Sequence, residues 1–210
     1  MTAQAGQIVD AVIFDFGGVL TVPEPIQEEL HRYERELGLP SDTIVWTIGS
    51  GPLWEAVSTG AIDERQYWEG VAAAFAPLLP PAFGRFQHGT LPYEELNPHV
   101  LDLVRALRGQ AKIGLLSNAT ISLAGYLRRL PAVSGLFDDI VISAEVGLRK
   151  PDLEIYRLAA QRLGADVQRC VMVDDKARNT LAAQTAGMCA VVYESPDQLR
   201  HALRGLNLAV

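Results

Sequence analysis

Short apolar runs recur along the chain, and their pattern predicts the buried strands of a parallel sheet. Each run is mostly apolar over four to six residues and lacks the alternation of polar and apolar positions that half-exposed strands show. Helical segments separate the last four runs. The predicted strands are residues 11–16, 112–116, 140–143, 169–173 and 189–193.

Helix signals between these runs support the same reading. Asn97-Pro98 predicts a helix start, because Asn caps free N–H groups and Pro is favoured at the first helical position. Residues 152–163 form an amphipathic segment that ends at a glycine, and Ser195-Pro196 opens a last helix. Strands that alternate with helices form right-handed βαβ units. The predicted fold is therefore an α/β, Rossmann-like, doubly wound parallel sheet with five core strands.

The stretch between the first two strands departs from this alternation. Roughly 75 residues show no convincing strand, and a structureless loop of that length is improbable in a compact domain. We predict an inserted α-helical domain at residues 21–96, and an α/β core made of residues 1–20 and 97–210. Prolines mark its entry and its exit: Pro23, Pro25, Pro77, Pro80, Pro81 and Pro92. The helical patterns inside it cover residues 26–37, 41–47, 53–58 and 63–75.

Composition narrows the choice of environment and partner. The net charge is −7, which disfavours a nucleic-acid partner bound through a basic face. No apolar run approaches the roughly 20 residues that span a bilayer, and the first ten residues show no secretory pattern. Cys170 and Cys189 lie in apolar runs without metal-ligand spacing and are predicted to be reduced thiols. These features predict a cytoplasmic protein with neither a nucleic-acid nor a membrane partner.

Polar residues follow the predicted strands at the edge where ligands of parallel sheets bind. Asp15 ends the first strand, Ser117-Asn118 the second and Asp174-Asp175 the fourth, while Arg149-Lys150 follows the third. Clustered carboxylates repel one another unless a cation lies between them, and oxygen ligands favour Mg²⁺ over Zn²⁺. Mg²⁺ and Lys150 together would neutralise a phosphoryl group, leaving a carboxylate free to attack it.

Four segments at these positions resemble the ordered motifs of the haloacid dehalogenase-like superfamily. They are residues 14–20 (FDFGGVL), Leu116-Ser117-Asn118, Arg149-Lys150-Pro151 and Val173-Asp174-Asp175. The resemblance extends over the whole chain, and the helical insert is similar to the C1-type cap of subfamily IA. It implies a Mg²⁺-dependent hydrolase in which Asp15 is the nucleophile and forms an aspartyl-phosphate.

The resemblance also implies a role for each residue of the site. Asp15, the Gly17 carbonyl and Asp175 would bind Mg²⁺, with Asp174 as a direct or indirect helper, and Lys150 would bridge phosphate and nucleophile. The implied substrate-binding residues are Ser117, the Asn118 backbone, Gly17 and Gly18. Asn179 would orient Asp175, although a polar residue in the first turn of a helix needs no such role.

One position departs from the common family pattern. Most phosphatases of the family carry a second Asp two residues after the nucleophile, as general acid and base, where this chain has Gly17. In this respect the chain resembles two groups of the family that carry Gly at the same position, the sugar-1-phosphate phosphatases and the N-terminal domains of epoxide hydrolases. The residue that replaces the acid is not identifiable from sequence, and Glu24 is the first candidate. The histidines show no spacing relation to the motifs and are weak catalytic candidates: His31, His88, His99 and His201. The aromatic residues of the insert are better explained as its core than as a substrate pocket: Trp46, Trp54, Tyr67, Trp68 and Phe75.

Three hypotheses follow from the motifs. The first is a phosphatase that acts on a small phosphorylated metabolite, with sugar phosphates as one candidate class. The second is a metal-free 2-haloacid dehalogenase, which uses the same nucleophile and Lys but has little use for paired Asp174-Asp175. The third is a non-catalytic protein that binds phosphorylated metabolites. The sequence does not choose between a monomer and a homodimer.

Overall fold

The computed structural model of the 210-residue chain describes residues 8–22, 24–75, 95–133 and 135–210, with the backbone alone at residues 24–26. Its main feature is a parallel five-stranded sheet with the order β5-β4-β1-β6-β7. The strands are β1 (Ala11–Phe14), β4 (Lys112–Ser117), β5 (Asp139–Ile142), β6 (Cys170–Asp174) and β7 (Cys189–Val192). All five predicted strands are confirmed, with ends that differ by one or two residues.

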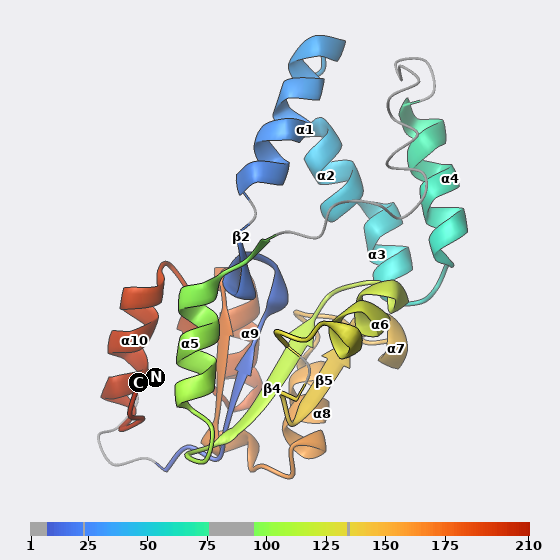
Figure 1. Ribbon diagram of the computed structural model, residues 1–210. Helices are drawn as coiled ribbons and strands as arrows, with labels where there is room; N and C mark the ends of the chain where they lie inside the picture. The colour runs from blue at the N-terminus through green and yellow to red at the C-terminus, as the bar shows by residue number, and fades with distance from the viewer. Residues whose placement is uncertain (1–7, 23, 76–94, 134) are drawn as a thin grey trace.

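Helices cover both faces of the sheet, as predicted. On one face lie α5 (Pro98–Ala106), α6 (Ile121–Arg129) and α10 (Pro196–Gly205), and on the other lie α8 (Leu153–Arg162) and α9 (Ala177–Ala186). Strand β1 shows why, because Val12 and Phe14 pack into the first layer while Ala11 and Ile13 pack into the second. Figure 1 shows these layers, with the carboxyl ends of the strands at the top of the sheet.

The predicted helix starts are present in detail. Asn97 accepts hydrogen bonds from the N–H groups of His99 and Val100, at 3.2 and 3.4 Å. Ser195 caps α10 by accepting from Gln198 N–H at 3.2 Å. Helix α8 is one residue shorter at each end than predicted, because Asp152 and Leu163 are its capping residues. Side-chain caps therefore mark the starts of α5 and α10, whereas Asp152 makes no side-chain cap to α8.

The segment between β1 and β4 contains four helices with a hydrophobic cluster of their own. They are α1 (Glu24–Leu37), α2 (Thr43–Gly49), α3 (Pro52–Ser58) and α4 (Glu64–Phe75). Their cluster includes buried Tyr67 and Phe75, with Trp54 and Trp68 packed against it, whereas Trp46 is 56% exposed. Figure 1 shows them beyond the carboxyl ends of the strands. We call α1–α4 the helical insert. The prolines predicted at its exit lie outside the described residues, as does Pro23.

One prediction about this segment was wrong. A short antiparallel pair, β2 (Thr21–Val22) and β3 (Glu95–Leu96), lies where no strand was predicted. Two-residue strands carry too little pattern to be read from sequence. This pair brings together the two chain segments that connect the core to the helical insert, so that the chain enters and leaves the insert side by side.

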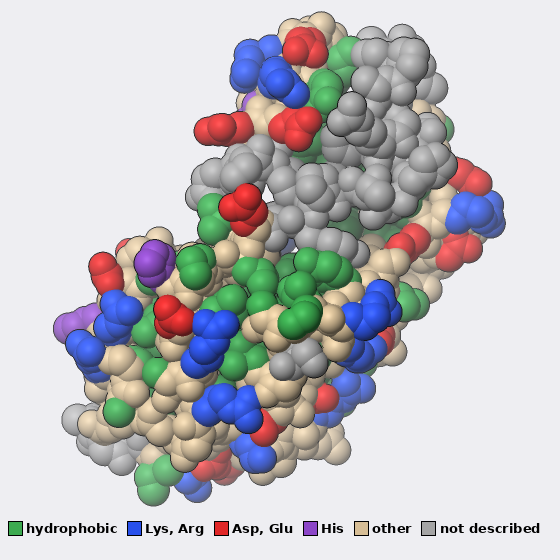
Figure 2. Space-filling model, viewed as in Figure 1, with side chains coloured by type: hydrophobic (Ala, Val, Ile, Leu, Met, Phe, Trp, Pro, Cys, Tyr) green, Lys and Arg blue, Asp and Glu red, His purple; other side chains and the backbone are tan. Residues whose placement is uncertain are grey.

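The surface adds little to the functional question. Among the described residues, no helix is long and apolar enough to cross a membrane. Lys and Arg side chains on the face shown in Figure 2 are scattered among acidic ones. Cys170 is buried and Cys189 half-buried, and both are free thiols.

Candidate active site

The site lies at the point where the strand order reverses. From β1 the chain continues to β4 and β5 on one side and then crosses to β6 and β7 on the other. The carboxyl ends of β1, β4 and β6 therefore meet at the switch point, which is where ligands of such sheets bind. Asp15 directly follows β1, Ser117 ends β4 and Asp174 ends β6. The structure thus brings together the residues that the motifs predicted.

Lys150 connects two of these carboxylates. Its Nζ lies 2.8 Å from Asp15 Oδ1 and 2.6 Å from Asp174 Oδ2, and all three side chains are almost completely buried. The Phe16 N–H also donates to Asp15 Oδ1, at 2.7 Å. One ammonium therefore serves two buried carboxylates, which leaves one negative charge uncompensated within this group.

Burial and this charge imbalance shift the pKa values of all three groups. Burial, together with repulsion from Asp174, raises the pKa of Asp15 to about 7, although Lys150 acts in the opposite direction. Burial would raise the pKa of Asp174 too, but Lys150 and three further hydrogen bonds hold it below its ordinary value. Burial would lower the pKa of Lys150, but the two carboxylates raise it. Of the two carboxyls that share Lys150, Asp15 is thus the one that ionises less readily before a cation binds.

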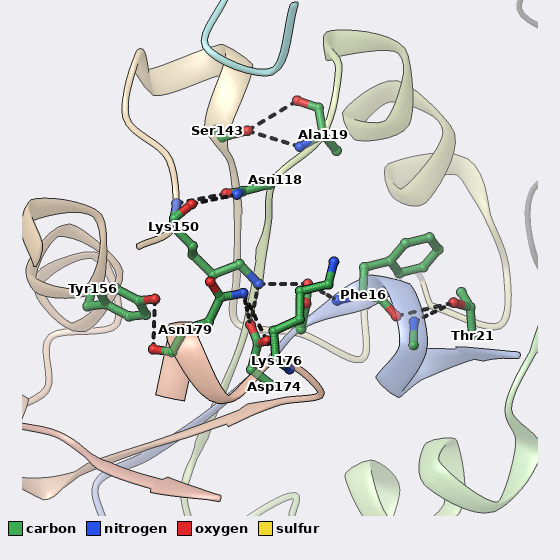
Figure 3. A network of polar contacts seen from close by, with 12 residues as sticks. Phe16, Thr21, Asn118, Ala119, Ser143, Lys150, Tyr156, Asp174, Lys176 and Asn179 are labelled. Carbon is green, nitrogen blue, oxygen red and sulfur yellow. Dashed lines mark hydrogen bonds and ion pairs between the residues drawn. The ribbon is translucent and has the colours of Figure 1, made fainter. Parts of the chain in front are cut away.

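Asp174 has all its acceptor positions occupied. Besides Lys150, it accepts from Lys176 N–H at 2.9 Å and from Asn179 Nδ2 at 2.9 and 3.0 Å (Figure 3). The sequence-based assignment of Asn179 to Asp175 was therefore wrong, because the amide lies on Asp174. Tyr156 holds the backbone of Asn179 by donating its hydroxyl to the Asn179 main-chain carbonyl at 2.9 Å.

Asp175 differs from Asp174, because its Oδ1 is buried without a hydrogen-bond partner. Burial is the main reason that the pKa of Asp175 is raised. Ligand oxygens of Asp15, Asp174 and Asp175 lie within 4.8 Å of one another. A buried oxygen with no donor, in a group of three carboxylates, is the arrangement that a bound hard cation would satisfy.

The glycine turn after Asp15 brings the backbone close to Asp175. Gly18 has φ = 75°, and a Cβ there would lie 2.8 Å from Asp175 Oδ2. Gly17, in contrast, has φ = −67° and ψ = 128°, which any residue adopts. Thr21 Oγ1 holds the turn by accepting from Gly18 N–H at 3.1 Å. Gly18 is therefore required both by its backbone conformation and by its contact with Asp175.

The second strand supplies a hydroxyl and an amide with different surroundings. The Ser117 side chain is buried and has no hydrogen-bond partner among the described residues. The Asn118 side chain bonds to the backbone of Lys150 at both its oxygen and its nitrogen. No feature of the sequence indicated that the Asn118 amide would be used in this way.

The remaining candidates lie away from the carboxylates. Arg149 forms an ion pair with Glu55 of α3 at 3.0 Å instead of joining the site as predicted. His31 pairs with Asp42 inside the insert, and His99 and His201 are exposed on α5 and α10. His88 and the Glu24 side chain are outside the described part of the structure.

The insert touches the core through a second polar contact that the sequence did not reveal. Glu64 of α4 accepts from the Ser122 N–H at 2.9 Å and from the Ser122 hydroxyl at 2.5 Å. Ser122 lies in the first turn of α6, directly beyond the Ser117 loop. Burial would raise the pKa of Glu64, but these hydrogen bonds lower it. Glu64 thus caps a core helix from the insert.

A family profile described as haloacid dehalogenase-like hydrolase matches residues 9–187. The chain belongs to this family. It is 30% identical over 181 residues to a sesquiterpene phosphatase, AstK, of Aspergillus oryzae, covering 85% of this chain and 86% of that protein. The family assignment makes the protein a hydrolase and confirms the resemblance read from the four motifs.

Solved structures share the fold. A haloacid dehalogenase family enzyme of Bacteroides thetaiotaomicron, in complex with magnesium and inorganic phosphate, has a TM-score of 0.67 at 18% identity, over 89% of this chain and 94% of that one. The L-2-haloacid dehalogenase of Xanthobacter autotrophicus, with chloropropionic acid covalently bound, has a TM-score of 0.65 at 18% identity, over 96% and 85%. The fold is therefore common to both chemistries and does not choose between them.

Proposed function

We propose that the protein is a Mg²⁺-dependent phosphatase that acts on a small phosphorylated metabolite through an aspartyl-phosphate at Asp15. The observation that carries the proposal is the unequal treatment of the carboxylates. Asp174 is fully hydrogen-bonded, whereas Asp175 keeps a buried oxygen with no donor beside Asp15. A metal-free reaction gives no reason to bury that oxygen.

The donor set fits Mg²⁺. Asp15, Asp175 and the Gly17 carbonyl would hold the ion, and the engagement of Asp174 with Lys150 favours an indirect role for Asp174. Bound Mg²⁺ would supply positive charge against phosphate and would lower the pKa of Asp15, so that the carboxylate is ionised at neutral pH. The family relation and the named phosphatase relative support the same choice.

The residues then divide the work of phosphoryl transfer. One Asp15 oxygen attacks phosphorus as the P–O bond to the substrate alcohol breaks, and the departing alkoxide takes its proton from solvent. Lys150, which already bonds Asp15 Oδ1 at 2.8 Å, neutralises phosphate oxygens. Ser117, with its hydroxyl unbonded among the described residues, would donate to a phosphate oxygen, as would the Asn118 backbone and the Gly17 N–H. Gly18 would shape this turn, since its own N–H donates to Thr21 Oγ1 at 3.1 Å. Water then cleaves the Asp15–phosphate bond and releases inorganic phosphate.

We propose further that the helical insert is a cap over this site, with core residues 1–20 and 97–210 and cap residues 21–96. Its separate hydrophobic cluster supports an independent unit. Its placement beyond the carboxyl ends of the strands supports a role in enclosing substrate (Figure 1). Side chains of the insert would then select the metabolite, with sugar phosphates as a candidate class.

A phosphate-release screen over phosphorylated metabolites, with and without Mg²⁺, tests the proposed function. We expect turnover of at least one ester and of an activated aryl phosphate, and loss of both when Mg²⁺ is chelated. The matched assay is chloride release from 2-chloropropionate in the absence of metal. Chloride release without phosphate release would favour the dehalogenase. Binding of phosphorylated metabolites without turnover of any ester would favour the non-catalytic alternative.

A further inference from the structure

The backbone of Lys150 is held by one side chain. Lys150 N–H donates to Asn118 Oδ1 at 2.8 Å, and Asn118 Nδ2 donates to the Lys150 carbonyl at 2.8 Å (Figure 3). In the described part of the chain, neither backbone group of Lys150 has another hydrogen-bond partner. The Asn118 side chain therefore satisfies both the N–H and the carbonyl of Lys150, as a neighbouring strand would in a sheet.

This contact joins two loops that carry the phosphate-binding groups. Asn118 directly follows Ser117 in the loop after β4, and Lys150 lies beyond β5. A second bridge joins the same two regions, because Ala119 N–H donates to Ser143 Oγ at 2.9 Å and the Ser143 hydroxyl donates to the Ala119 carbonyl at 3.3 Å. The Ser143 bridge does not touch Lys150, so it offers a matched comparison.

We propose that Asn118 is a positioning residue: its side chain sets the backbone of Lys150 so that Nζ lies between Asp15 and Asp174. The inference deepens the proposed function and rests on it, since it assigns to the Asn118 amide a role separate from its backbone N–H. Lys150 Nζ has to meet two carboxylates at 2.8 and 2.6 Å at once. A displacement of about 1 Å in such a site can cost roughly 10²-fold in rate.

A double-mutant cycle on kcat/KM with an activated aryl phosphate tests this role. Asn118→Ala removes both hydrogen bonds, and Asn118 is only half-buried, so water can replace them. We expect Asn118→Ala to lower kcat/KM by about 10- to 100-fold. In both Asn118→Ala and Lys150→Ala, kcat should fall and KM should rise. In the Lys150→Ala background the same substitution should cost less than about 2-fold. An equal loss in both backgrounds would overturn the proposal.

Two further measurements separate positioning from general stability. Ser143→Ala removes the neighbouring bridge at a fully buried residue, so it should lower the melting temperature at least as much as Asn118→Ala. Its kcat/KM should fall less than about 3-fold, and a loss as large as that of Asn118→Ala would contradict the proposal.

Crystal structures of the wild-type protein and Asn118→Ala give a readout that needs no turnover. We expect Lys150 Nζ to lose at least one of its two carboxylate contacts in the variant. Retention of both contacts would overturn the inference whatever the activity. If the wild-type protein hydrolyses no phosphate ester, the proposed function fails, and the position of Lys150 in the variant still decides the role of Asn118.

Discussion

Replacing Asp15, the proposed nucleophile, should stabilise the metal-free protein at alkaline pH. Asp15 and Asp174 share the single ammonium of Lys150, so this buried group of three carries one uncompensated negative charge when Asp15 is ionised. Asp15→Asn removes that charge and leaves a neutral pair between Lys150 and Asp174. The variant should be inactive and yet more stable, because under the proposed function the charge of Asp15 binds metal and attacks substrate, whereas it destabilises the fold.

The size of the effect follows from the pKa of Asp15. The value is raised from 3.8 to about 7 in the folded protein, so Asp15 favours folding when protonated, and stability is lost as the pH rises from about 4 to about 7. Relative to a carboxyl with an unshifted pKa, Asp15 lowers the free energy of unfolding by about 2 kcal/mol at about pH 5.5, where folding must protonate it, and by about 4 kcal/mol at about pH 8. Asn carries no such cost. The stability of the variant relative to wild type should therefore rise by about 2 kcal/mol between these pH values.

Chemical denaturation of both proteins at the two pH values, with a chelator present, measures this difference. Asp197→Asn, at an exposed position on α10, is the surface control and should change stability by less than about 1 kcal/mol at both pH values. Millimolar Mg²⁺ should cancel the advantage of Asp15→Asn, because the wild-type site then binds the ion and the variant binds it weakly. A variant that is less stable than wild type at about pH 8, or equally affected at both pH values, would refute the charge argument.

Three other predictions concern the turn and the insert. Gly18→Ala should cost about 1–2 kcal/mol of strain at φ = 75°. It should also abolish the rise in melting temperature caused by Mg²⁺, because its Cβ would displace Asp175. Gly17→Ala is the control, since it carries no backbone strain. Wild-type rates on aryl phosphates should fall steeply as the leaving-group pKa rises, and Gly17→Asp should help poor leaving groups by up to ~10². Glu64→Gln should lower stability at neutral pH by about 0.5–1 kcal/mol by weakening the cap on Ser122, an effect lost as the pH falls through the lowered pKa of Glu64.

Each of these predictions has a result that contradicts it. If Mg²⁺ raises the melting temperatures of Gly18→Ala and Gly17→Ala equally, the contact between Gly18 and Asp175 does not govern Mg²⁺ binding. A shallow leaving-group dependence in the wild-type protein would mean that another residue already donates the proton. For the insert, exposed Glu69→Gln is the control, and a loss of stability as large as that of Glu64→Gln would deny the cap a specific role.

The elements of the core could be predicted because their signals are local. An apolar run between polar loops and a capped helix start depend on a few adjacent residues, so the strands and the starts of α5 and α10 matched closely. The clustering of Asp15, Ser117 and Asp174 also followed from a general rule, since parallel strands bring their carboxyl ends to one edge.

The partners of individual side chains could not be predicted, because they depend on tertiary geometry. Spacing gave no means of telling whether Asn179 would bond Asp174 or Asp175, which are adjacent in the chain. Arg149 and Lys150 are also adjacent, yet one pairs with the insert and the other with the carboxylates. Only the folded arrangement decides which of two neighbours points into a site.

Chemical trapping of the reaction intermediate tests the central claim most directly. Hydroxylamine converts an acyl phosphate on a carboxylate to a hydroxamate, which peptide mass spectrometry assigns to a residue. With Mg²⁺ and an activated aryl phosphate present, the account predicts a hydroxamate at Asp15 that is absent without substrate and absent in Asp15→Asn. Phosphate release with Asp15 unmodified, or with the hydroxamate at another carboxylate such as Asp175, would contradict it.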